Sequence, residues 1–320
     1  MPKQKAGTKK TQWRYGIGEW YGRSFVQLTP QERQYYASIQ TIPKAERAPQ
    51  ACPFQSKLGN IVNCGKSGGI CSLRSYEKAP ATGLVTIDSR RSSLRTTCPS
   101  RFEQDGTIYR WIGETLLANP DASAIGETPF LQRVPLMGPV ECESKREVGR
   151  IDNVLVTPGT SPLQWAPVEK QAVYFSGEKM GLEFQNIANF EGQGFPFPIK
   201  NRRPDYRSSG PKRLLPQLEI KVPTLRTWGK KMAVVVDEDF FNQLGHMKPA
   251  PANDISNAEV VWFVVRYVEG VGGFTLGRLK TFLTTLKEAV DGLVAAIPVP
   301  QGRFEETIRA KLHKVIVPSS

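Results

Sequence analysis

The chain has 320 residues, a hydrophobic fraction of 39% and a formal net charge of +13, which indicate a soluble globular protein of one large or two medium domains. No apolar run reaches membrane-spanning length and the N-terminus lacks the apolar stretch of a signal peptide, so we expect a cytoplasmic protein without a membrane partner. The surplus of 43 Lys and Arg over 30 Asp and Glu favours a polyanionic partner such as nucleic acid, although a merely basic protein is the alternative.

The N-terminal third combines a basic tail with a segment poor in apolar runs. Residues 1–25 are basic and Gly-rich, and residues 1–10 are expected to form either a disordered tail or an arm on DNA. The sequence Thr-Pro-Gln-Glu that starts at Thr29 is typical of a helix N-terminus and predicts a short helix over residues 30–40. Residues 42–100 hold many Gly, Ser and Arg, so they can bury little surface and a bound metal would help them fold.

The rest of the chain alternates between predicted helices and strands. A helix over residues 100–118 has the candidate core positions Ile108, Trp111, Ile112, Leu116 and Leu117. Strands are predicted over residues 151–156, 172–175, 181–187, 232–237 and 259–268. Amphipathic helices are predicted over residues 212–228, with a kink or break at Pro223, and over residues 276–297 and 303–315. Together these elements predict an α/β fold.

Four of the five cysteines cluster in the N-terminal third: Cys52, Cys64, Cys71 and Cys98. Without a secretion signal, such a cluster indicates a metal site rather than a disulfide framework. Four thiolates suit one structural iron or zinc ion and leave no open position for catalysis. Four unrelated buried thiols are the alternative. Cys142 has no evident partner, and we interpret it as a buried free thiol.

Two of the predicted strands carry acids that suit phosphodiester hydrolysis, which needs carboxylates to hold a hard divalent cation. Asp152 stands in one apolar strand, and a period of two places Glu183 and Gln185 on one face of another. An edge strand with a solvated acid is the alternative. We predict that Asp152 and Glu183 hold Mg²⁺ and that Gln185 orients a water or a phosphate oxygen. Glu147 is a candidate for a third carboxylate.

A competing pattern lies further along the chain. Pro204-Asp205, then 13 residues, then Glu219-Ile220-Lys221 matches the nominal P-D and E-x-K signature of a large nuclease superfamily. We favour the first site, because Glu219 lies in a predicted helix and Asp205 in a predicted loop. The loop supplies three candidates for DNA contact: Arg202, Arg203 and Arg207. Arginine suits the readout of guanine, and a solvated basic face is the alternative.

Several short motifs resemble those of the NotI and EagI restriction endonucleases, in the same order and over roughly residues 20–245. The motifs are Cys52-Pro53-Phe54, Gly69-Ile70-Cys71-Ser72, Cys98-Pro99-Ser100, Val148-Gly149-Arg150-Ile151-Asp152, Gly181-Leu182-Glu183-Phe184-Gln185 and Lys212-Arg213-Leu214-Leu215-Pro216-Gln217. The last 75 residues match weakly. Asn153 departs from the aromatic residue that family members often carry after the strand aspartate.

The resemblance implies a PD-(D/E)xK nuclease core, with a mixed sheet flanked by helices, behind an iron- or zinc-bearing N-terminal part. In that family Gln replaces the usual Lys of E-x-K, as Gln185 would here. The implied function is a type II restriction endonuclease, a homodimer that cuts double-stranded DNA with Mg²⁺ and has a cognate DNA methyltransferase in the same system. The predicted organisation is a basic tail (1–25), a four-cysteine metal-binding region (26–105) and a nuclease domain (106–320).

Two rival functions use the same features. The first is a non-catalytic DNA-binding protein with a structural metal knuckle, and the second is a degenerate nuclease kept for DNA binding. Both rivals share the positive charge and the cysteine cluster with the leading hypothesis. A metal-dependent cleavage assay separates either of them from an endonuclease.

Overall fold

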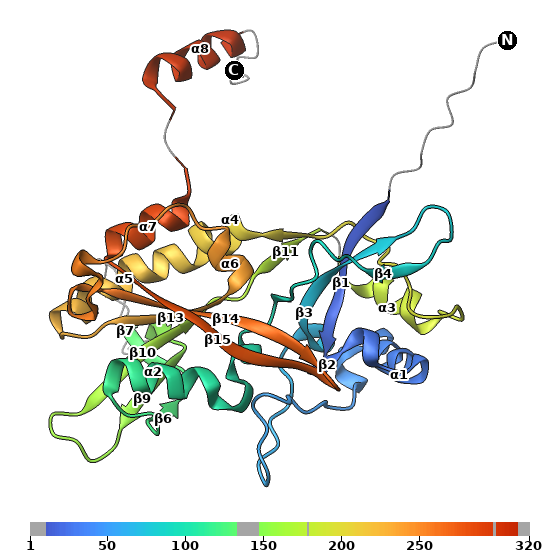
Figure 1. Cartoon of the computed structure of the whole chain (residues 1–320), viewed down its shortest axis with the longest axis horizontal. Coiled ribbons are helices and arrows are strands. Elements are labelled where there is room, and N and C mark those ends of the chain that lie inside the picture. Colours follow the sequence, from blue (N-terminus) through green and yellow to red (C-terminus); the bar gives the residue numbers. More distant parts are fainter. Residues whose placement is uncertain (1–10, 133–146, 178, 297–298, 313–320) are drawn as a thin grey trace, which may run out of the picture.

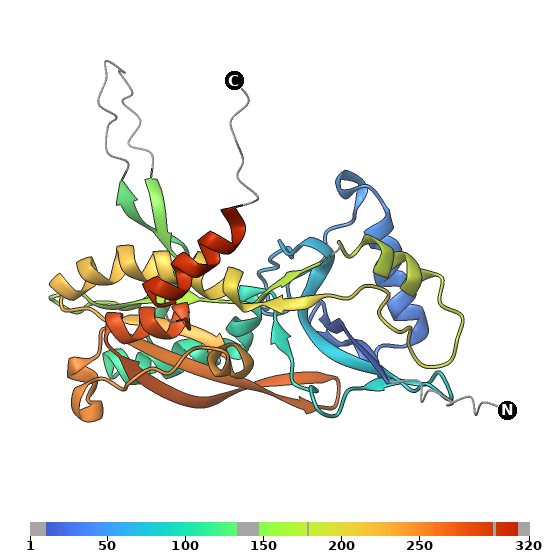
Figure 2. The same cartoon turned by 90° about the horizontal axis from the view of Figure 1, so that it is seen from above.

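The computed structural model describes residues 11–132, 147–177, 179–296 and 299–312 of the chain. A smaller N-terminal sheet lies at one end of the molecule, beside a larger central sheet that is covered by helices (Figure 1). Seen from above, the same two parts lie next to each other along the long axis (Figure 2). Among the described residues, no helix is both long and apolar enough to cross a membrane.

The N-terminal sheet is antiparallel, in the order β2-β1-β3-β4, with β5 also paired to β3. Its core includes Trp20, Phe25 and Phe184. The predicted helix start at Thr29 is confirmed, because the Thr29 hydroxyl accepts from the Glu32 amide and the Glu32 carboxylate accepts from the Thr29 amide. The elements here are β1 (Gln12–Trp20), β2 (Arg23–Ser24), β3 (Ile70–Lys78), β4 (Val85–Ile87), β5 (Arg95–Thr96), α1 (Pro30–Thr41) and α3 (Gly181–Ala188).

The central sheet has the order β15-β14-β13-β10-β9-β6. β13 runs parallel to β10 and β14, whereas the other pairs are antiparallel, so the sheet is mixed. Helix α2 covers one face and helices α5 and α7 cover the other. The predicted α/β fold is therefore confirmed. The bounds are β6 (Ser123–Ile125), β9 (Asn153–Thr157), β10 (Gln164–Lys170), β13 (Met232–Asp237), β14 (Val260–Gly270), β15 (Gly273–Thr284), α2 (Thr107–Leu117), α5 (Leu215–Thr227) and α7 (Leu286–Val294).

The side chains of β13 alternate between the two faces of the central sheet. Val235 packs in the cluster under α2, whereas Val234 and Val236 pack in the cluster under α5 and α7. Helix α5 contributes Leu218, Val222 and Leu225 to the second cluster. This packing fixes the position of α5 over β10 and β13.

Smaller elements complete the fold. Two two-stranded ribbons and three exposed or short helices flank the sheets: β7 (Thr128–Gln132) with β8 (Glu147–Ile151), β11 (Tyr174–Ser176) with β12 (Arg203–Asp205), α4 (Tyr206–Ser209), α6 (Glu238–Asn242) and α8 (Gln301–Lys311). The tighter or wider helical turns are η1 (Phe25–Gln27), η2 (Lys44–Glu46), η3 (Ser67–Gly69), η4 (Pro99–Gly106), η5 (Gly210–Leu214), η6 (Pro251–Asn253) and η7 (Ile255–Asn257).

Two predictions about local structure are wrong, and the break expected at Pro223 as the alternative to a kink does not occur. The strand predicted over residues 181–187 is helix α3, because Phe184 and Ile187 share a helical face that packs in the N-terminal core. The helix predicted over residues 276–297 is strand β15 followed by the shorter α7, since β15 pairs with β14 along its whole length. Helix α5 continues through Pro223 instead of breaking there.

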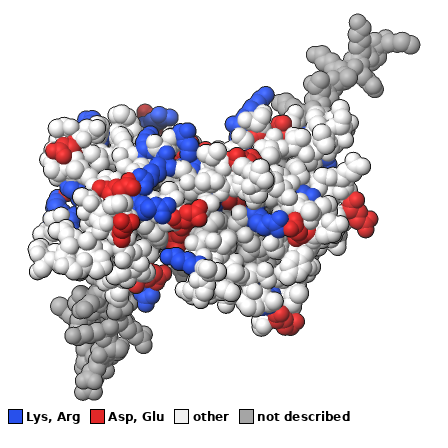
Figure 3. Space-filling model, turned by 60° about the horizontal axis from the view of Figure 1, so that its bottom comes forward, with Lys and Arg blue, Asp and Glu red and all other residues white. Residues whose placement is uncertain are grey.

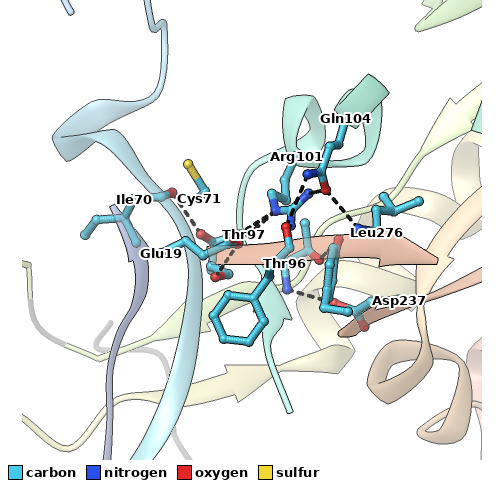
Figure 4. Close-up of polar contacts among 12 residues, drawn as sticks. Glu19, Ile70, Cys71, Thr96, Thr97, Arg101, Gln104, Asp237 and Leu276 are labelled. Atoms are coloured by element: carbon cyan, nitrogen blue, oxygen red, sulfur yellow. Dashed lines mark hydrogen bonds and ion pairs between the residues drawn. The ribbon is translucent and has the colours of Figure 1, made fainter. Parts of the chain in front are cut away.

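A buried ion pair joins the two sheets. Arg101 of η4 and Glu19 of β1 are both fully buried, with 2.8 Å between Nε and Oε2. Arg101 also donates to the Phe274 carbonyl at the start of β15, at 3.0 Å, and to the Gln104 amide oxygen, which accepts in turn from the Leu276 amide (Figure 4). The guanidinium thus connects both sheets through one side chain.

Asp237, at the end of β13, forms a second connection between the sheets. Its carboxylate accepts from the Thr96 amide of β5 at 2.7 Å (Figure 4) and from the Phe240 amide of α6 at 2.8 Å. Burial raises the pKa of Asp237 to about 6, and the two amide donors offset only part of that rise. Since the folded pKa exceeds the unfolded pKa, this group contributes most stability at low pH, and its contribution falls as the pH rises through about 6.

We predict that Asp237→Asn makes the unfolding free energy less dependent on pH. Between pH 5 and pH 7.5 the parent should lose about 1 kcal/mol more than the variant, because the variant has no proton to release. Urea unfolding of both proteins at the two pH values measures the difference. Parallel pH profiles for the parent and the variant would contradict the assignment.

Candidate active site

Two acids face each other across adjacent antiparallel strands of the central sheet. Val168 of β10 pairs with Asn153 of β9, so Glu169 is opposite Asp152 in the register. The Asp152 carboxylate accepts from the Lys170 amide at 2.9 Å, and the Asp152 amide donates to the Glu169 carboxylate. These two hydrogen bonds, one to Lys170 and one to Glu169, hold Asp152 against the end of β10.

Glu169 is 2% exposed and forms an ion pair with Lys221 of helix α5, at 2.5 Å between Oε1 and Nζ. Burial raises the pKa of Glu169 to about 7, the negative charge of Asp152 adds to the rise, and Lys221 opposes it. A carboxyl with so high a pKa, beside a second carboxylate, is typical of functional sites that take up a cation.

Gln171 follows β10 two residues after Glu169, which places both on the same face of the chain. Together with Asp152 it lines a pocket of about 520 Å³. Gln217 of helix α5 also lines this pocket. Carboxylates and amides that converge on a concave space can bind a cation and an oxygen-rich substrate.

The wall of this pocket is basic. Among its described lining residues Asp152 is the one acid, and the cations are Lys66, Lys170, Lys179, Arg202 and Arg213. Arg213 is exposed and stacks on Tyr174, with its guanidinium carbon 4.8 Å from the ring centre. The face of the molecule drawn in Figure 3 carries Lys and Arg interspersed with Asp and Glu. The basic lining therefore lies next to the two acids.

The structure separates the predicted pair of metal-binding acids. Glu183 lies on α3 over the N-terminal sheet, not on a strand, and is 4% exposed. Its carboxylate accepts from Arg202 at 2.9 Å and from the Lys200 amide at 2.9 Å. Gln185 is exposed on the same helix, and neither Glu183 nor Gln185 is among the residues that line the pocket of Asp152.

The competing pattern of Asp205, Glu219 and Lys221 is also dispersed. Asp205 caps helix α4 by accepting from the Ser208 amide and hydroxyl, and these hydrogen bonds lower its pKa. Glu219 is exposed on α5, whereas Lys221 of the same triplet points to Glu169.

The remaining candidates lie at different places. Glu147 is the first residue of β8, while Cys142 and residues 1–10 lie outside the described residues. Arg202 is buried beside Glu183, and Arg203 and Arg207 are exposed in a second pocket of about 510 Å³.

Three of the four clustered cysteines, Cys52, Cys71 and Cys98, are buried, and Cys64 is partly exposed. Burial raises the pKa of Cys64, and the nearby thiols of Cys52 and Cys98 raise it further. The Cys98 amide donates to the Cys71 carbonyl at 3.2 Å. The four thiols therefore lie in the same region, and thiolate is the type of ligand that a soft metal ion prefers. Within the described ranges, however, no three Cys, His, Asp or Glu side chains form a group that could hold a metal ion.

The comparison with known families identifies the chain. A family model described as restriction endonuclease NotI matches residues 37–276, a span that contains Asp152, Glu169 and all four clustered cysteines. The chain belongs to the NotI restriction endonuclease family. No curated protein matches it. Helices α7 and α8 lie beyond the part that matches the NotI model.

The sequence analysis did not single out Glu169 or Gln171, and it placed Lys221 only in the competing Glu219-Ile220-Lys221 pattern. The available signal was Val168-Glu169-Lys170-Gln171, a Glu-x-Gln triplet that closely follows the apolar strand after Asp152. The triplet at Glu183 has the same Glu-x-Gln pattern, but pairing between strands decides which acid faces Asp152.

We predict that Glu183→Ala acts on stability. Removing the carboxylate breaks a buried ion pair with Arg202, which typically costs about 3–5 kcal/mol. Urea unfolding at pH 7 measures the loss. Gln185→Ala, on the exposed side of the same helix, is the matched control and should stay within about 0.5 kcal/mol of the parent. A Glu183 variant as stable as this control would show that the pair is not structural.

Proposed function

We propose that this member of the NotI family is a type II restriction endonuclease that hydrolyses double-stranded DNA with Mg²⁺ at Asp152, Glu169 and Gln171. The observation that carries the proposal is the placement of Asp152 opposite Glu169, hydrogen-bonded to Glu169 and Lys170 of β10, beside a basic pocket. An Asp on one strand and Glu-x-Gln on the next is the arrangement expected of a PD-(D/E)xK core in which Gln replaces Lys. In this proposal Glu169 and Gln171 take the roles first assigned to Glu183 and Gln185.

Asp152 and Glu169 fit a magnesium ion in chemistry, because Mg²⁺ is commonly held by one or two carboxylates and completes its shell with water and phosphate oxygens. When bound, the cation would neutralise charge on the scissile phosphate and lower the pKa of a bound water. Gln171 carries no charge, so its amide orients a water or a phosphate oxygen by hydrogen bonding. Burial of Glu169 and its ion pair keep this carboxylate in one position.

The cations around the pocket suit the DNA backbone. Exposed Lys179 and Arg213 would contact phosphates on either side of the scissile bond, and Lys66 extends the basic wall from the cysteine-containing segment. Exposed Arg203 and Arg207 remain candidates for base contact, as does Arg202 should it exchange its partner on binding. A homodimer would match the two-fold symmetry of a palindromic site, and a cognate methyltransferase would protect the host DNA.

We predict that Asp152→Asn and Glu169→Gln each reduce cleavage of a plasmid or phage DNA by at least about a hundredfold, because each removes a carboxylate that would hold the cation. DNA binding should survive, since fewer negative charges then face the phosphates. A cleavage gel in Mg²⁺ buffer and a filter-binding assay measure the two effects.

Asp205→Asn and Glu219→Gln are the controls, and both should cleave like the parent. The proposal fails if the Asp152 and Glu169 variants remain active while the Asp205 and Glu219 variants are inactive. If neither the parent nor any variant cleaves DNA but all of them still bind it, the result would instead favour the degenerate nuclease.

We further propose that Cys52, Cys64, Cys71 and Cys98 close on one structural iron or zinc ion. Their shared neighbourhood and the family resemblance support this. The positive charge of a bound metal would stabilise the thiolates and so offset the rise in the pKa values of Cys64 and Cys71 that burial causes. A four-thiolate cage has no open position, so the ion would stabilise the N-terminal part without entering the reaction.

We predict that the purified protein contains close to one equivalent of iron or zinc per chain. Cys98→Ser should release the ion and lower the melting temperature, because the binding energy is part of the folding energy. Cys142→Ser is the matched control and should retain the ion. Elemental analysis of the three proteins decides the matter, and neither metal in the parent would exclude the site.

A further inference from the structure

Lys221 is a buried lysine whose three N–H donors each have an acceptor. Nζ lies 2.5 Å from Glu169 Oε1, 2.6 Å from the Arg150 carbonyl and 2.7 Å from the Gln217 amide oxygen. The residue is only 4% exposed. An ammonium group with three short donor contacts is charged and held in one orientation.

The burial of this charge needs an explanation beyond stability. Removing two charges from water costs about as much as their attraction returns, so an apolar pair of similar size would stabilise the fold equally well. The ion pair of Lys221 with Glu169 also lies next to Asp152. The three side chains together carry a net negative charge that a bound cation can neutralise. Lys221 is therefore better explained by the site than by the core.

The position of Lys221 links both strands that carry the acids. Arg150, whose carbonyl it binds, is two residues before Asp152, and Glu169 is on β10. Lys221 itself belongs to helix α5, and Leu218 and Val222 pack this helix against the core. Lys221 thus sets the separation of the two carboxylates from outside the sheet.

The strand itself lacks a positive charge at the usual place. In the E-x-K signature the lysine comes two residues after the glutamate, where this chain has Gln171. Lys221 belongs to Glu219-Ile220-Lys221, whose glutamate is exposed and turned away from the site. The helix therefore brings to Glu169 the kind of side chain that position 171 does not have.

We propose that Lys221 is a positioning residue that supplies from helix α5 the positive charge that the strand lacks, and so holds Glu169 opposite Asp152 for the divalent cation. The proposal rests on the proposed function of this site. It assigns no contact between Lys221 and DNA. Its consequence is that the charge can be moved: a lysine at position 171 should replace the one at position 221.

The test exchanges the two residues. Lys221→Gln keeps a hydrogen-bond donor but removes the charge, and Gln171→Lys combined with Lys221→Gln restores the charge on the strand. Affinity for Mn²⁺ alone, followed by the loss of the free-ion electron paramagnetic resonance signal, is measured without DNA, and cleavage is measured in Mg²⁺ buffer. Lys221→Gln should lose at least tenfold in Mn²⁺ affinity and at least a hundredfold in cleavage, and the exchanged protein should regain at least tenfold in both.

Lys231→Gln is the matched control, because Lys231 is partly buried and donates to two backbone carbonyls, those of Ser256 and Ala258, but faces no carboxylate of the site. It should bind Mn²⁺ and cleave like the parent. Should Lys221→Gln not fold, Lys221→Arg keeps the charge, and the exchanged protein is compared with it for Mn²⁺ affinity.

Two results would overturn the proposal. One is a folded Lys221→Gln protein with the Mn²⁺ affinity and cleavage of the parent. The other is an exchanged protein that folds but recovers neither property, which would reduce Lys221 to a structural role. Both results leave the proposed function standing as long as Asp152→Asn is inactive, so the failure of one can be distinguished from the failure of the other.

Discussion

Repulsion between two neighbouring carboxylates is the constraint around which the central sheet is organised. Asp152, just before β9, lies opposite Glu169 of β10, and two hydrogen bonds between backbone amides and carboxylates tie Asp152 to Glu169 and Lys170. The fold compensates their charge with a buried lysine from a different layer, and it leaves Asp152 partly open to a pocket with a basic wall. Two adjacent carboxylates would be costly in a purely structural sheet because they repel each other. A divalent cation bound between them would make the arrangement favourable by neutralising their charge.

The N-terminal sheet takes part in this site although it carries neither acid. The Thr96 carbonyl of β5 accepts from the Val173 amide, two residues after Gln171, and the Thr96 amide donates to Asp237. The pocket wall also includes Lys66 from the cysteine-containing segment. The guanidinium of Arg101, three residues after Cys98, also ties this segment to β15. The proposed structural metal would then stabilise one wall of the pocket.

Local chemistry made some elements predictable from the sequence, whereas pairing between distant segments decided the others. The capping residues Thr29 and Glu32 specify the start of α1 by themselves, and the apolar run of β13 matches its prediction over residues 232–237. Residues 181–187 satisfy both a strand and a helix pattern, and the contact of Phe184 with Trp20, stacked at 5.6 Å, selects the helix. For β15, the long antiparallel pairing with β14 overrides a helical pattern in the same residues.

The site shows the same division between local and non-local information. Asp152 was predictable because its apolar surroundings lie next to it in the chain. Glu169 was not, since its meaning depends on the register that sets it opposite Asp152. Lys221 illustrates the limit of reading motifs as text. The E-x-K triplet that contains it lies on a helix, where its first and third residues point in different directions. Glu219 therefore faces solvent, while Lys221 contacts Glu169, 52 residues earlier in the chain. What the site requires is two carboxylates and one positive charge at fixed separations, and a helix packed over a strand can meet that requirement as well as neighbouring positions on one strand can.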